Sequence, residues 1–404
     1  MNPTKEATQP VELLETRTVA VGVDPADVPA PVGPAAAPVL PPARNLWQLQ
    51  LNFENLIRER AIHYPVAYRL VRELGRGRQG IVFLGLRYGA RGCVTRHAIK
   101  IFDPSIYAGV EQYWTDMGRI ASQTSLLQTV NSPNLVSRDA YEEVNGIGYM
   151  QMEVVDGADL HYLLQGEHLD TAKNHSTYQE WAHFTDVIFR VEPQGVSIQP
   201  GVALYIMRQI LRGLETLHEL GFLHGDIKPA NIMLNGLGYV KLVDYGRATR
   251  INERSGILFG TPLYMAPEQH RRRPSLIPAD IYSVGLVGIE MLRGRRLIDP
   301  AGMTEQDLLD FKMDLPRTLP DLLPEHVRQN SQFLELLAKF VDPDPRRRYQ
   351  WTGDADAGSS GLRIVHQQLA QIGRDAEYGR ELQAYLVKIR DSQLRSDLIE
   401  TPGH

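Results

Sequence analysis

The sequence predicts an α+β fold of two unequal parts: a small antiparallel β-rich part with one helix, then a larger, mainly helical part. Three observations predict it. Residues 67–102 alternate β-branched and polar side chains between glycines, the pattern of consecutive strands. From residue 201 onward, apolar side chains recur at helical spacing. The 404 residues are enough to bury a core in each part.

Composition and charge are those of an ordinary globular protein. Hydrophobic residues make up 43% of the chain and charged residues 23%. The 43 basic and 48 acidic side chains give a net charge of −5, which offers no electrostatic case for nucleic acid or an anionic membrane. The longest apolar stretch, 281–292, is too short to cross a bilayer. We therefore expect neither nucleic acid nor membrane as a partner.

The chain has a single cysteine, Cys93, which cannot form an internal disulfide. A reducing compartment is the natural interpretation, and the first ten residues carry no signal-like pattern. We expect a cytoplasmic protein in which Cys93 is a buried thiol.

The N-terminal elements differ sharply in composition. Residues 1–44 are expected to be a disordered arm, because the Pro/Ala-rich stretch 20–44 cannot bury enough apolar area to offset its ordering entropy. Residues 46–62 have apolar positions at helical spacing and predict a helix within an extension, 45–66. Strands are then expected over 69–75, 80–88 and 96–102, a helix over about 106–130, and strand character again over 135–154.

The second part reads as helices separated by polar loops. Helices are predicted over 201–220, 281–293 and 330–341, and two more amphipathic helices within 361–398. A polar insertion at 165–200 carries no chemistry that its residues identify. The expected layout is a small lobe at 67–155, a large lobe at 156–352 and a C-terminal helical tail at 353–404.

The first motif is Gly75-Arg-Gly77-Arg-Gln-Gly80, between two predicted strands. Glycines let the backbone approach phosphates and donate amide hydrogens where a side chain would clash. A dinucleotide-binding turn would be followed by a helix, whereas a strand follows here, which favours a hairpin over a nucleotide. A plain glycine-rich hairpin is the alternative. Lys100, twenty residues on in a strand, can bridge two phosphates, while Ala98 is small enough to admit a flat base.

The second motif is Asp226-Ile-Lys228-Pro-Ala-Asn231, between two apolar segments. The Asp can accept or orient a hydroxyl proton, the Lys can neutralise a transferring phosphoryl group, and the Asn can hold a metal. A turn with an Asx cap is the structural alternative. Asp244, next to Tyr245 and Gly246, follows a strand, and its spacing from Asn231 suits a hairpin that returns both groups to one site.

The last motif runs from Gly260-Thr-Pro to Ala-Pro-Glu268. No reaction requires Glu268 directly, so we expect it to pair with a buried arginine, Arg348. Asp280 either holds backbone amides of the 224–231 loop or caps its helix.

With these signals in order, residues 67 to about 350 resemble the eukaryotic-type protein kinase family, a bacterial member being one possibility. Lys228 within Asp-x-Lys-x-x-Asn, together with Gly-Thr-Pro ahead of Ala-Pro-Glu, is similar to the serine/threonine branch. The resemblance implies the bilobal kinase fold, ATP and Mg²⁺ (or Mn²⁺) as cofactors, and a protein with a Ser or Thr acceptor as the substrate.

The resemblance also implies a role for each matched residue. Asp226 would be the catalytic base. Lys228 would support the γ phosphate, and Lys100 would contact the α and β phosphates. Asn231 and Asp244 would bind the metal. The remaining nucleotide-binding residues would be Gly75, Gly77 and Gly80 in the glycine-rich loop, Val82, Ala98 and Met233 around the base, Met152 as gatekeeper, the backbone of Glu153 and Val154 at the hinge, and Asp159 at the ribose.

Three positions depart from the family pattern. Gly225 stands where many members have an Arg that grips a phosphate, so phosphorylation of Thr249 or Ser255 is not expected to activate the enzyme by that route. Tyr245 replaces a Phe, and its hydroxyl needs a partner. Gln123 stands where a Glu would pair with Lys100, and it can offer only a hydrogen bond.

Three other functions fit parts of the sequence. Gln123 is the one argument for a weak or inactive pseudokinase that serves as a scaffold. The small-molecule phosphotransferases have a similar His-Gly-Asp loop. They lack a lysine two residues after the Asp, which is Lys228 here, and a segment like 260–268 that cradles a peptide. A pure interaction protein would use the ends of the chain, 1–44 or 353–404, to recruit a partner.

Overall fold

A computed structural model describes residues 45–192, 195–245, 248–252, 261–299, 303–369 and 377–389. All of them belong to one compact unit, Ala43–His404. The arm predicted at 1–44 lies outside the described residues, as do Gly246 and Ser255.

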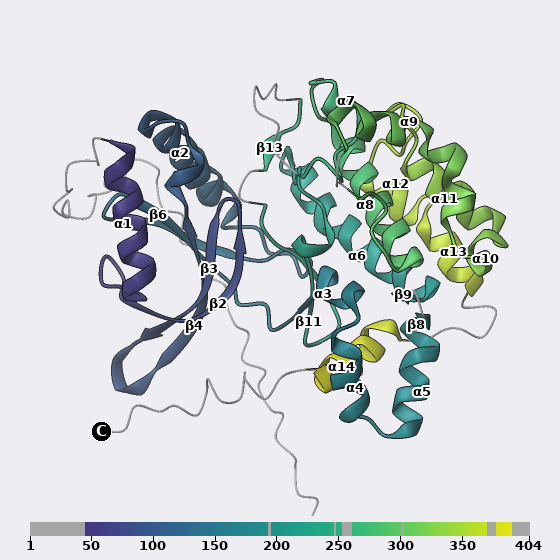
Figure 1. Cartoon of the computed structure of the whole chain (residues 1–404), viewed down its shortest axis with the longest axis horizontal. Helices are drawn as coiled ribbons and strands as arrows, with labels where there is room; N and C mark the ends of the chain where they lie inside the picture. The colour runs from purple at the N-terminus through teal and green to yellow at the C-terminus, as the bar shows by residue number, and fades with distance from the viewer. Residues whose placement is uncertain are drawn as a thin grey trace, which may run out of the picture. The chain divides into compact units, whose positions relative to one another are not determined.

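The first part of the fold is a six-stranded antiparallel sheet (Figure 1), in the order β1-β2-β3-β4-β6-β5. Its strands are β1 (Ala61–Ile62), β2 (Tyr68–Gly77), β3 (Gly80–Tyr88), β4 (Val94–Phe102), β5 (Arg138–Val144) and β6 (Ile147–Met152). The predicted strands are confirmed. The pairs β2–β3 and β3–β4 are hairpins, which place the glycine motif and Lys100 on neighbouring strands.

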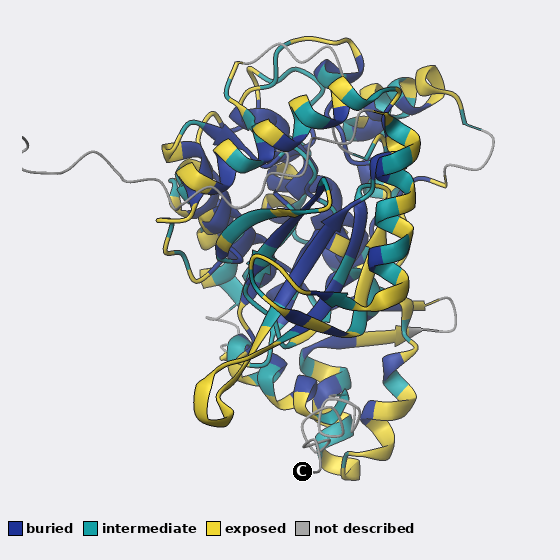
Figure 2. Ribbon diagram, turned by 90° about the vertical axis from the view of Figure 1, so that its left-hand side faces the viewer, coloured by how far each residue is buried: buried dark blue, intermediate teal, exposed yellow. Residues whose placement is uncertain are grey.

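Two helices pack against this sheet. Helix α2 (Val110–Leu127) buries Tyr113, Met117 and Ile120 at helical spacing and lies against β5. It begins later than predicted, because a 3-10 turn (Pro104–Ile106) precedes it and Gly109 is its N-cap. Helix α1 (Leu46–Glu59), predicted over 46–62, buries Leu49 and Leu56. Figure 2 shows the buried central strands of the sheet.

The second part is mainly helical. Its centre is α6 (Pro200–Glu219) against α8 (Ile277–Arg293), which is buried from Ile277 to Leu292 as the apolar stretch predicts. The other helices are α3 (Leu160–Gln165), α7 (Pro267–His270), α9 (Glu305–Leu322), α10 (Glu325–Arg328), α11 (Ser331–Phe340), α12 (Thr352–Ala357) and α13 (Leu362–Leu369). Small sheets join β7 (Gly157–Asp159), β11 (Ile232–Asn235) and β12 (Val240–Leu242), and β10 (Phe222–Leu223) with β13 (Thr249–Arg250).

The polar insertion folds into α4 (His168–Asn174), α5 (Tyr178–Val187) and the hairpin of β8 (Phe189–Glu192) and β9 (Gly195–Ile198). The C-terminal helix α14 (Tyr378–Ile389) packs on it (Figure 1). The Tyr385 ring centroid lies 4.8 Å from that of Phe189. A hydrogen bond of 2.7 Å joins His183 to Glu381, and an ion pair joins Lys388 to Glu180 at 2.8 Å. The insertion therefore provides the surface on which α14 packs.

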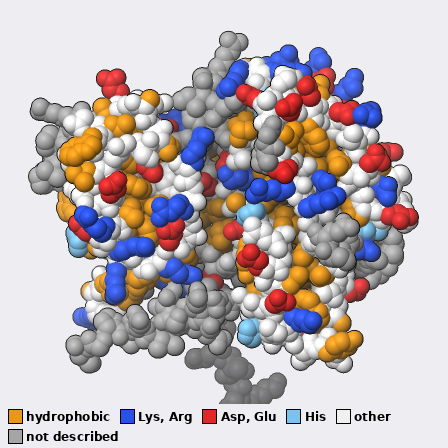
Figure 3. All heavy atoms as spheres, viewed as in Figure 1, with side chains coloured by type: hydrophobic (Ala, Val, Ile, Leu, Met, Phe, Trp, Pro, Cys, Tyr) orange, Lys and Arg blue, Asp and Glu red, His pale blue; other side chains and the backbone are white. Residues whose placement is uncertain are grey.

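Two findings concern the surface. Cys93 is exposed, so the prediction of a buried thiol is wrong: it lies in the short connection between β3 and β4, beyond the packed part of the hairpin. Positive and negative side chains are interspersed on the face shown in Figure 3. No helix in the described part of the chain is long and apolar enough to span a membrane.

Candidate active site

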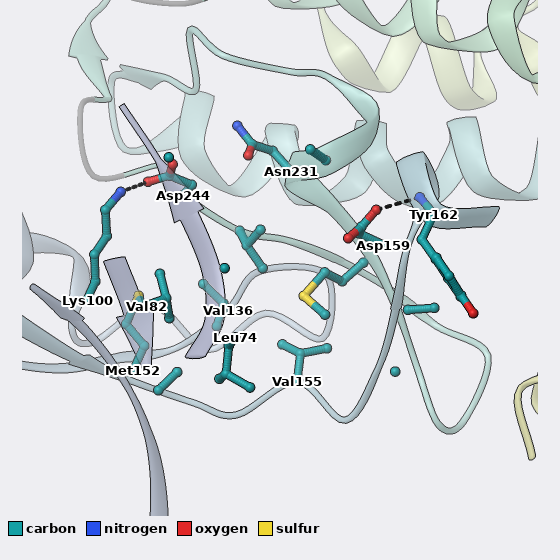
Figure 4. Close-up of a pocket in the computed structure, with 18 of the residues that line it drawn as sticks. Leu74, Val82, Lys100, Val136, Met152, Val155, Asp159, Tyr162, Asn231 and Asp244 are labelled. Atoms are coloured by element: carbon teal, nitrogen blue, oxygen red, sulfur yellow. Dashed lines mark hydrogen bonds and ion pairs between the residues drawn. The ribbon is translucent and has the colours of Figure 1, made fainter. Parts of the chain in front are cut away.

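A cavity of about 1010 Å³ is lined by residues of both parts of the fold. Every residue that the sequence analysis placed in the site lines it: Gly75, Gly77, Gly80, Val82, Ala98, Lys100, Met152, Glu153, Val154, Asp159, Asp226, Lys228, Asn231, Met233 and Asp244. Figure 4 shows Lys100 and Asp244 at one end, Asp159 and Tyr162 at the other, and apolar side chains between them. An apolar middle with polar ends suits a flat base attached to a charged chain.

The three glycines of the first motif differ in how much space a side chain would have. A Cβ on Gly80 would lie 1.9 Å from the carbonyl oxygen of Ile101, so the close approach of β4 requires glycine there. A Cβ on Gly75 or Gly77 would meet nothing within 4 Å, although both line the cavity. Packing within the protein therefore does not require these two glycines, which fits a loop kept open for a ligand.

Lys100 extends into the cavity from β4, where it is paired with Val82 of β3. Its side chain is only 5% exposed, and Nζ donates to the Asp244 carboxylate and, at 3.2 Å, to Gln79 Oε1. The ion pair of Lys100 with Asp244 thus joins the sheet to the helical part. Ala98 lies two residues before Lys100, on the same face of the strand.

In the described part of the chain, Gln123 forms no hydrogen bond with Lys100. Its Nε2 donates to the carbonyl oxygen of Ala248, and its buried Oε1 has no partner among the described residues. Glu111 and Asp116 do not substitute for the missing carboxylate, because Asp116 bonds to Arg119 and Tyr107 and Glu111 lies in the first turn of α2. The amide of Gln123 is therefore used to join α2 to the segment after Tyr245.

The walls of the cavity are largely apolar. Met233 of β11 is paired with Asp159 of β7, and Leu74, Val136 and Val155 join the predicted apolar residues (Figure 4). Asp159 also caps α3, accepting from the Tyr162 amide at 2.8 Å, and burial raises the pKa of its carboxyl group.

The hinge backbone is partly engaged within the protein. The amide of Glu153 donates to Ser137 O at 3.1 Å, so the carbonyl oxygen of Glu153 is the backbone group that could face a base, and its predicted contact with adenine stays a prediction. The Glu153 carboxylate accepts from Lys241 at 2.9 Å and from the Ser137 amide at 3.2 Å. These bonds tie the hinge to the start of β5 and to β12.

Asp226 is held by four donors. Its Oδ1 accepts from the amide and the hydroxyl of Thr261, both at 2.8 Å. Its Oδ2 accepts from Lys228 Nζ at 2.7 Å and Asn231 Nδ2 at 3.0 Å. Burial alone would raise the pKa of this carboxyl group, but the charge of Lys228 and the bonds from Lys228 and Thr261 outweigh it, and the pKa lies below its ordinary value. Asp226 is therefore ionised at neutral pH.

Asn231 and Asp244 are brought together by the predicted hairpin. Strands β11 and β12 pair with Ile232 opposite Leu242, and the Val243 amide donates to Asn231 O at 3.0 Å. Asn231 commits its Nδ2 to Asp226, which turns its amide oxygen elsewhere. Asp244 has a φ of 58°. This strained conformation is uncommon for a residue other than glycine, and such residues cluster at functional sites.

The oxygen donors of an Asp and an Asn suit a hard divalent cation such as Mg²⁺ or Mn²⁺. No cluster of three or more His, Cys, Asp or Glu side chains occurs in the described ranges. Mg²⁺ commonly takes only one or two protein carboxylates and completes its coordination with water and substrate phosphates. An Asp and an Asn beside an open cavity suit that mode of binding.

Three contacts expected from the sequence support the site from outside the cavity. Asp280 accepts from the amides of His224 and Gly225, both at 2.9 Å, so it holds the loop and does not cap its helix. Glu268 forms a buried bidentate pair with Arg348 at 2.7 and 2.8 Å, which confirms that prediction. The Tyr245 hydroxyl donates to Val136 O, so it has the partner that it needed.

Sequence reasoning missed the contribution of the C-terminal helix. Leu386, Val387 and Ile389 of α14 line the cavity, as does Tyr162 of α3. The amphipathic pattern of 361–398 predicted helices but carried no signal for the surface that they cover.

Comparison with known proteins assigns the family. The protein kinase domain family matches residues 68–353, more than half of the chain, so the chain belongs to the protein kinase family. The predicted bilobal α+β fold is thereby confirmed.

The curated relatives are serine/threonine-protein kinases. Pkn1 of Myxococcus xanthus is 28% identical over 249 residues, which are 59% of this chain and 31% of that protein. PknA of Mycobacterium tuberculosis is 28% identical over 302 residues, 72% of this chain and 60% of that protein. The kinase sid1 of Schizosaccharomyces pombe is 29% identical over 293 residues, 71% of this chain and 53% of that protein. The matched region therefore spans only 31–60% of these relatives' lengths.

Proposed function

We propose that this chain is a protein serine/threonine kinase that transfers the γ-phosphoryl group of ATP to a Ser or Thr hydroxyl of a protein, with Asp226 as the catalytic base. The observation that carries the proposal is the bond network around Asp226. The Thr261 hydroxyl donates to Asp226 at 2.8 Å and accepts from Lys228 at 3.0 Å. These are the contacts that an acceptor hydroxyl needs when it loses a proton beside a transferring phosphoryl group.

Each residue has a defined part in this reaction. Asp226 orients the acceptor hydroxyl and takes its proton, while a bond forms from that oxygen to the γ phosphorus and the bond from phosphorus to ADP breaks. Lys228 compensates the negative charge that develops on the transferred group. Lys100 holds the inner phosphates beneath the loop of Gly75 and Gly77. Asp244 and the amide oxygen of Asn231 would hold Mg²⁺, which neutralises phosphate charge when bound.

The nature of the acceptor is argued from the segment after residue 260. Half-buried Thr261 and exposed Pro262 line the cavity beside Asp226, so an acceptor enters next to a segment that the small-molecule phosphotransferases lack. That arrangement suits a polypeptide better than a small alcohol. A small-molecule phosphotransferase is the alternative, and an assay decides between the two.

The test is transfer of labelled γ-phosphate by the purified chain with ATP and Mg²⁺, to generic protein substrates and, separately, to small alcohols and aminoglycosides. We expect label on Ser or Thr of protein only. Asp226→Asn should lower the rate by about 10²- to 10⁴-fold while nucleotide binding persists, and Asp310→Asn, on the exposed face of α9, should be neutral. Nucleotide binding without any transfer would support the pseudokinase suggested by Gln123, and label on the small alcohols alone would reassign the substrate.

A further inference from the structure

A fully buried lysine lies beneath the segment that follows the cavity. Lys312, on α9, has an exposed fraction of 0%. Its Nζ donates to Pro262 O at 2.6 Å and Met265 O at 2.7 Å, and lies 2.9 Å from His270 Nε2. All three partners are neutral groups in or next to the 260–268 motif. One side chain thus gathers two carbonyls of that motif and the end of α7.

Burying this amine is unfavourable for the folded state. Burial lowers the pKa of Lys312 to about 7, and no neighbouring charge offsets that effect. An apolar side chain of similar length would fill the same space without desolvating a charge. Filling space is therefore not a sufficient reason for a lysine at this position. What a lysine adds over an apolar side chain is its bonds to the carbonyl oxygens of Pro262 and Met265.

Those carbonyls belong to the stretch nearest the proposed acceptor. Pro262 lines the cavity, and its neighbour Thr261 bonds to Asp226. The same stretch is fixed from α8, where Ser283 donates to Tyr264 O at 2.7 Å and Glu290 accepts from the Tyr264 hydroxyl at 2.8 Å. Lys312 holds the carbonyls on either side of Leu263 and Tyr264. The backbone of 262–265 is therefore tied to both α8 and α9.

We propose that Lys312 is a positioning residue for the protein substrate: by fixing the backbone of 262–265, it sets the affinity for the polypeptide that presents its hydroxyl to Asp226. The inference rests on the proposed kinase function and adds a residue that positions the segment beside the acceptor. It assigns Lys312 no contact with ATP or with the reacting atoms.

His270 supports the lysine. When Lys312 is an ammonium, which only donates, His270 Nε2 accepts from it, and the ring proton is then on Nδ1. Nδ1 lies 3.3 Å from Glu305 Oε1 and donates to it. Burial, reinforced by the charge of Lys312, lowers the pKa of His270, which keeps the ring neutral and able to accept. The Glu305–His270–Lys312 chain thus orients Nζ toward the two carbonyls.

The first experiment compares wild type with Lys312→Met, and with Lys339→Met on α11 as the matched control. Lys339 bonds to Ser360 and lies over the Tyr349 ring, outside the 260–268 motif. The readouts are KM for a phosphorylated protein substrate, KM for ATP, and ATP hydrolysis with water as the acceptor. We expect Lys312→Met to raise the protein KM about tenfold, as for loss of one charge-assisted hydrogen bond, with the other two values unchanged. Lys339→Met should change none of them.

A second pair keeps the proposal testable if Lys312→Met does not fold. His270→Gln retains an acceptor for Nζ and should keep the protein KM near that of wild type, whereas His270→Leu removes the acceptor and should raise it. An unchanged protein KM in folded Lys312→Met overturns the inference, as does an equal loss of ATP affinity. If Lys312→Met is unfolded, equal KM values for the two His270 variants overturn it. Failure of wild type to phosphorylate any protein would instead refute the kinase proposal.

Discussion

Single side chains around the cavity carry much of the chemistry, and their neighbours decide what each one does. Asp226 is largely buried, yet four donors and the charge of Lys228 keep its pKa low. Lys312 is buried among neutral acceptors, and its pKa falls to about 7. A base beside a transferring phosphoryl group must be ionised, whereas a lysine that only orders backbone carbonyls can tolerate a loss of charge.

At the residue scale, Lys312 predicts a pH dependence of stability. Its pKa is about 7 in the folded chain against an ordinary value of 10.5, so between these values the unfolded chain binds a proton that the folded chain has released. Stability contributed by Lys312 should therefore rise with pH above 7, by up to about 1.4 kcal/mol per pH unit. Denaturant unfolding of wild type and Lys312→Met from pH 6 to 9 measures this difference, and a constant difference over that range would contradict the prediction.

Gln123 leads to a second prediction at this scale. Because its Nε2 donates to Ala248 O, a carboxylate in its place would lose that bond and face a carbonyl oxygen. Gln123→Glu should lower the unfolding free energy by about 1–3 kcal/mol and should not raise the phosphorylation rate. Thermal denaturation and the transfer assay check this, with Gln128→Glu at the end of α2 as a control. A faster enzyme would mean that α2 can shift to bring the carboxylate to Lys100.

At the scale of elements, the insertion at 165–200 and the helix α14 pack against each other. Helix α14 buries Tyr378, Leu382, Tyr385 and Leu386, and its far end lines the cavity. It contacts the rings of Phe184 in α5 and Phe189 in β8, and the side chains of Glu180 and His183 in α5. An insertion without recognisable chemistry thus provides the surface on which α14 lies.

A matched pair of substitutions tests this packing. Tyr385→Ala removes a buried ring that contacts Phe184, Phe189 and His168, and should cost about 3–5 kcal/mol of stability. Tyr385→Phe loses only the hydroxyl bonded to His168 and should cost about 1 kcal/mol. Denaturant unfolding gives both values, and nucleotide affinity should weaken only in the alanine variant. Equal, small effects would mean that α14 is not docked in solution.

At the scale of the whole molecule, polar contacts join the two parts of the fold at several places, among them the bonds of Lys241 to Glu153 and of Tyr245 to Val136. Lys100 and Asp244 join the sheet to the helical part, and Gln123 joins α2 to Ala248. Gly225 supplies no cation to this network, and its φ of 75° favours glycine there. A phosphate on the segment that follows Asp244 would therefore find no arginine at position 225 to bind.

That arrangement predicts how the enzyme responds to phosphorylation. Thr249→Glu, and phosphorylation of Thr249 or Ser255, should change the transfer rate by less than about fivefold, because a solvent-accessible charge pair contributes at most about 1 kcal/mol. The transfer assay on Thr249→Glu, Thr249→Gln and wild type measures this. A large gain in rate with the acidic variant alone would show that another cation takes the place of the missing arginine.

The sequence alone predicted the main strands, the central helices and the motif residues of the cavity, because strand alternation, helical spacing and short motifs are local properties of the chain. It also paired Glu268 with Arg348 and found the hairpin between Asn231 and Asp244. It did not predict α9 or the cavity residues Tyr162, Leu386, Val387 and Ile389. Only the tertiary structure decided which side chains meet over long separations: His168 with Tyr385, 217 residues apart, and Lys312 with the backbone at 262–265. Such contacts follow from how helices pack, and packing leaves no periodic signal in the sequence. The exposure of Cys93, the partners of Lys312 and the position of α14 beside the cavity were therefore seen only in the folded chain.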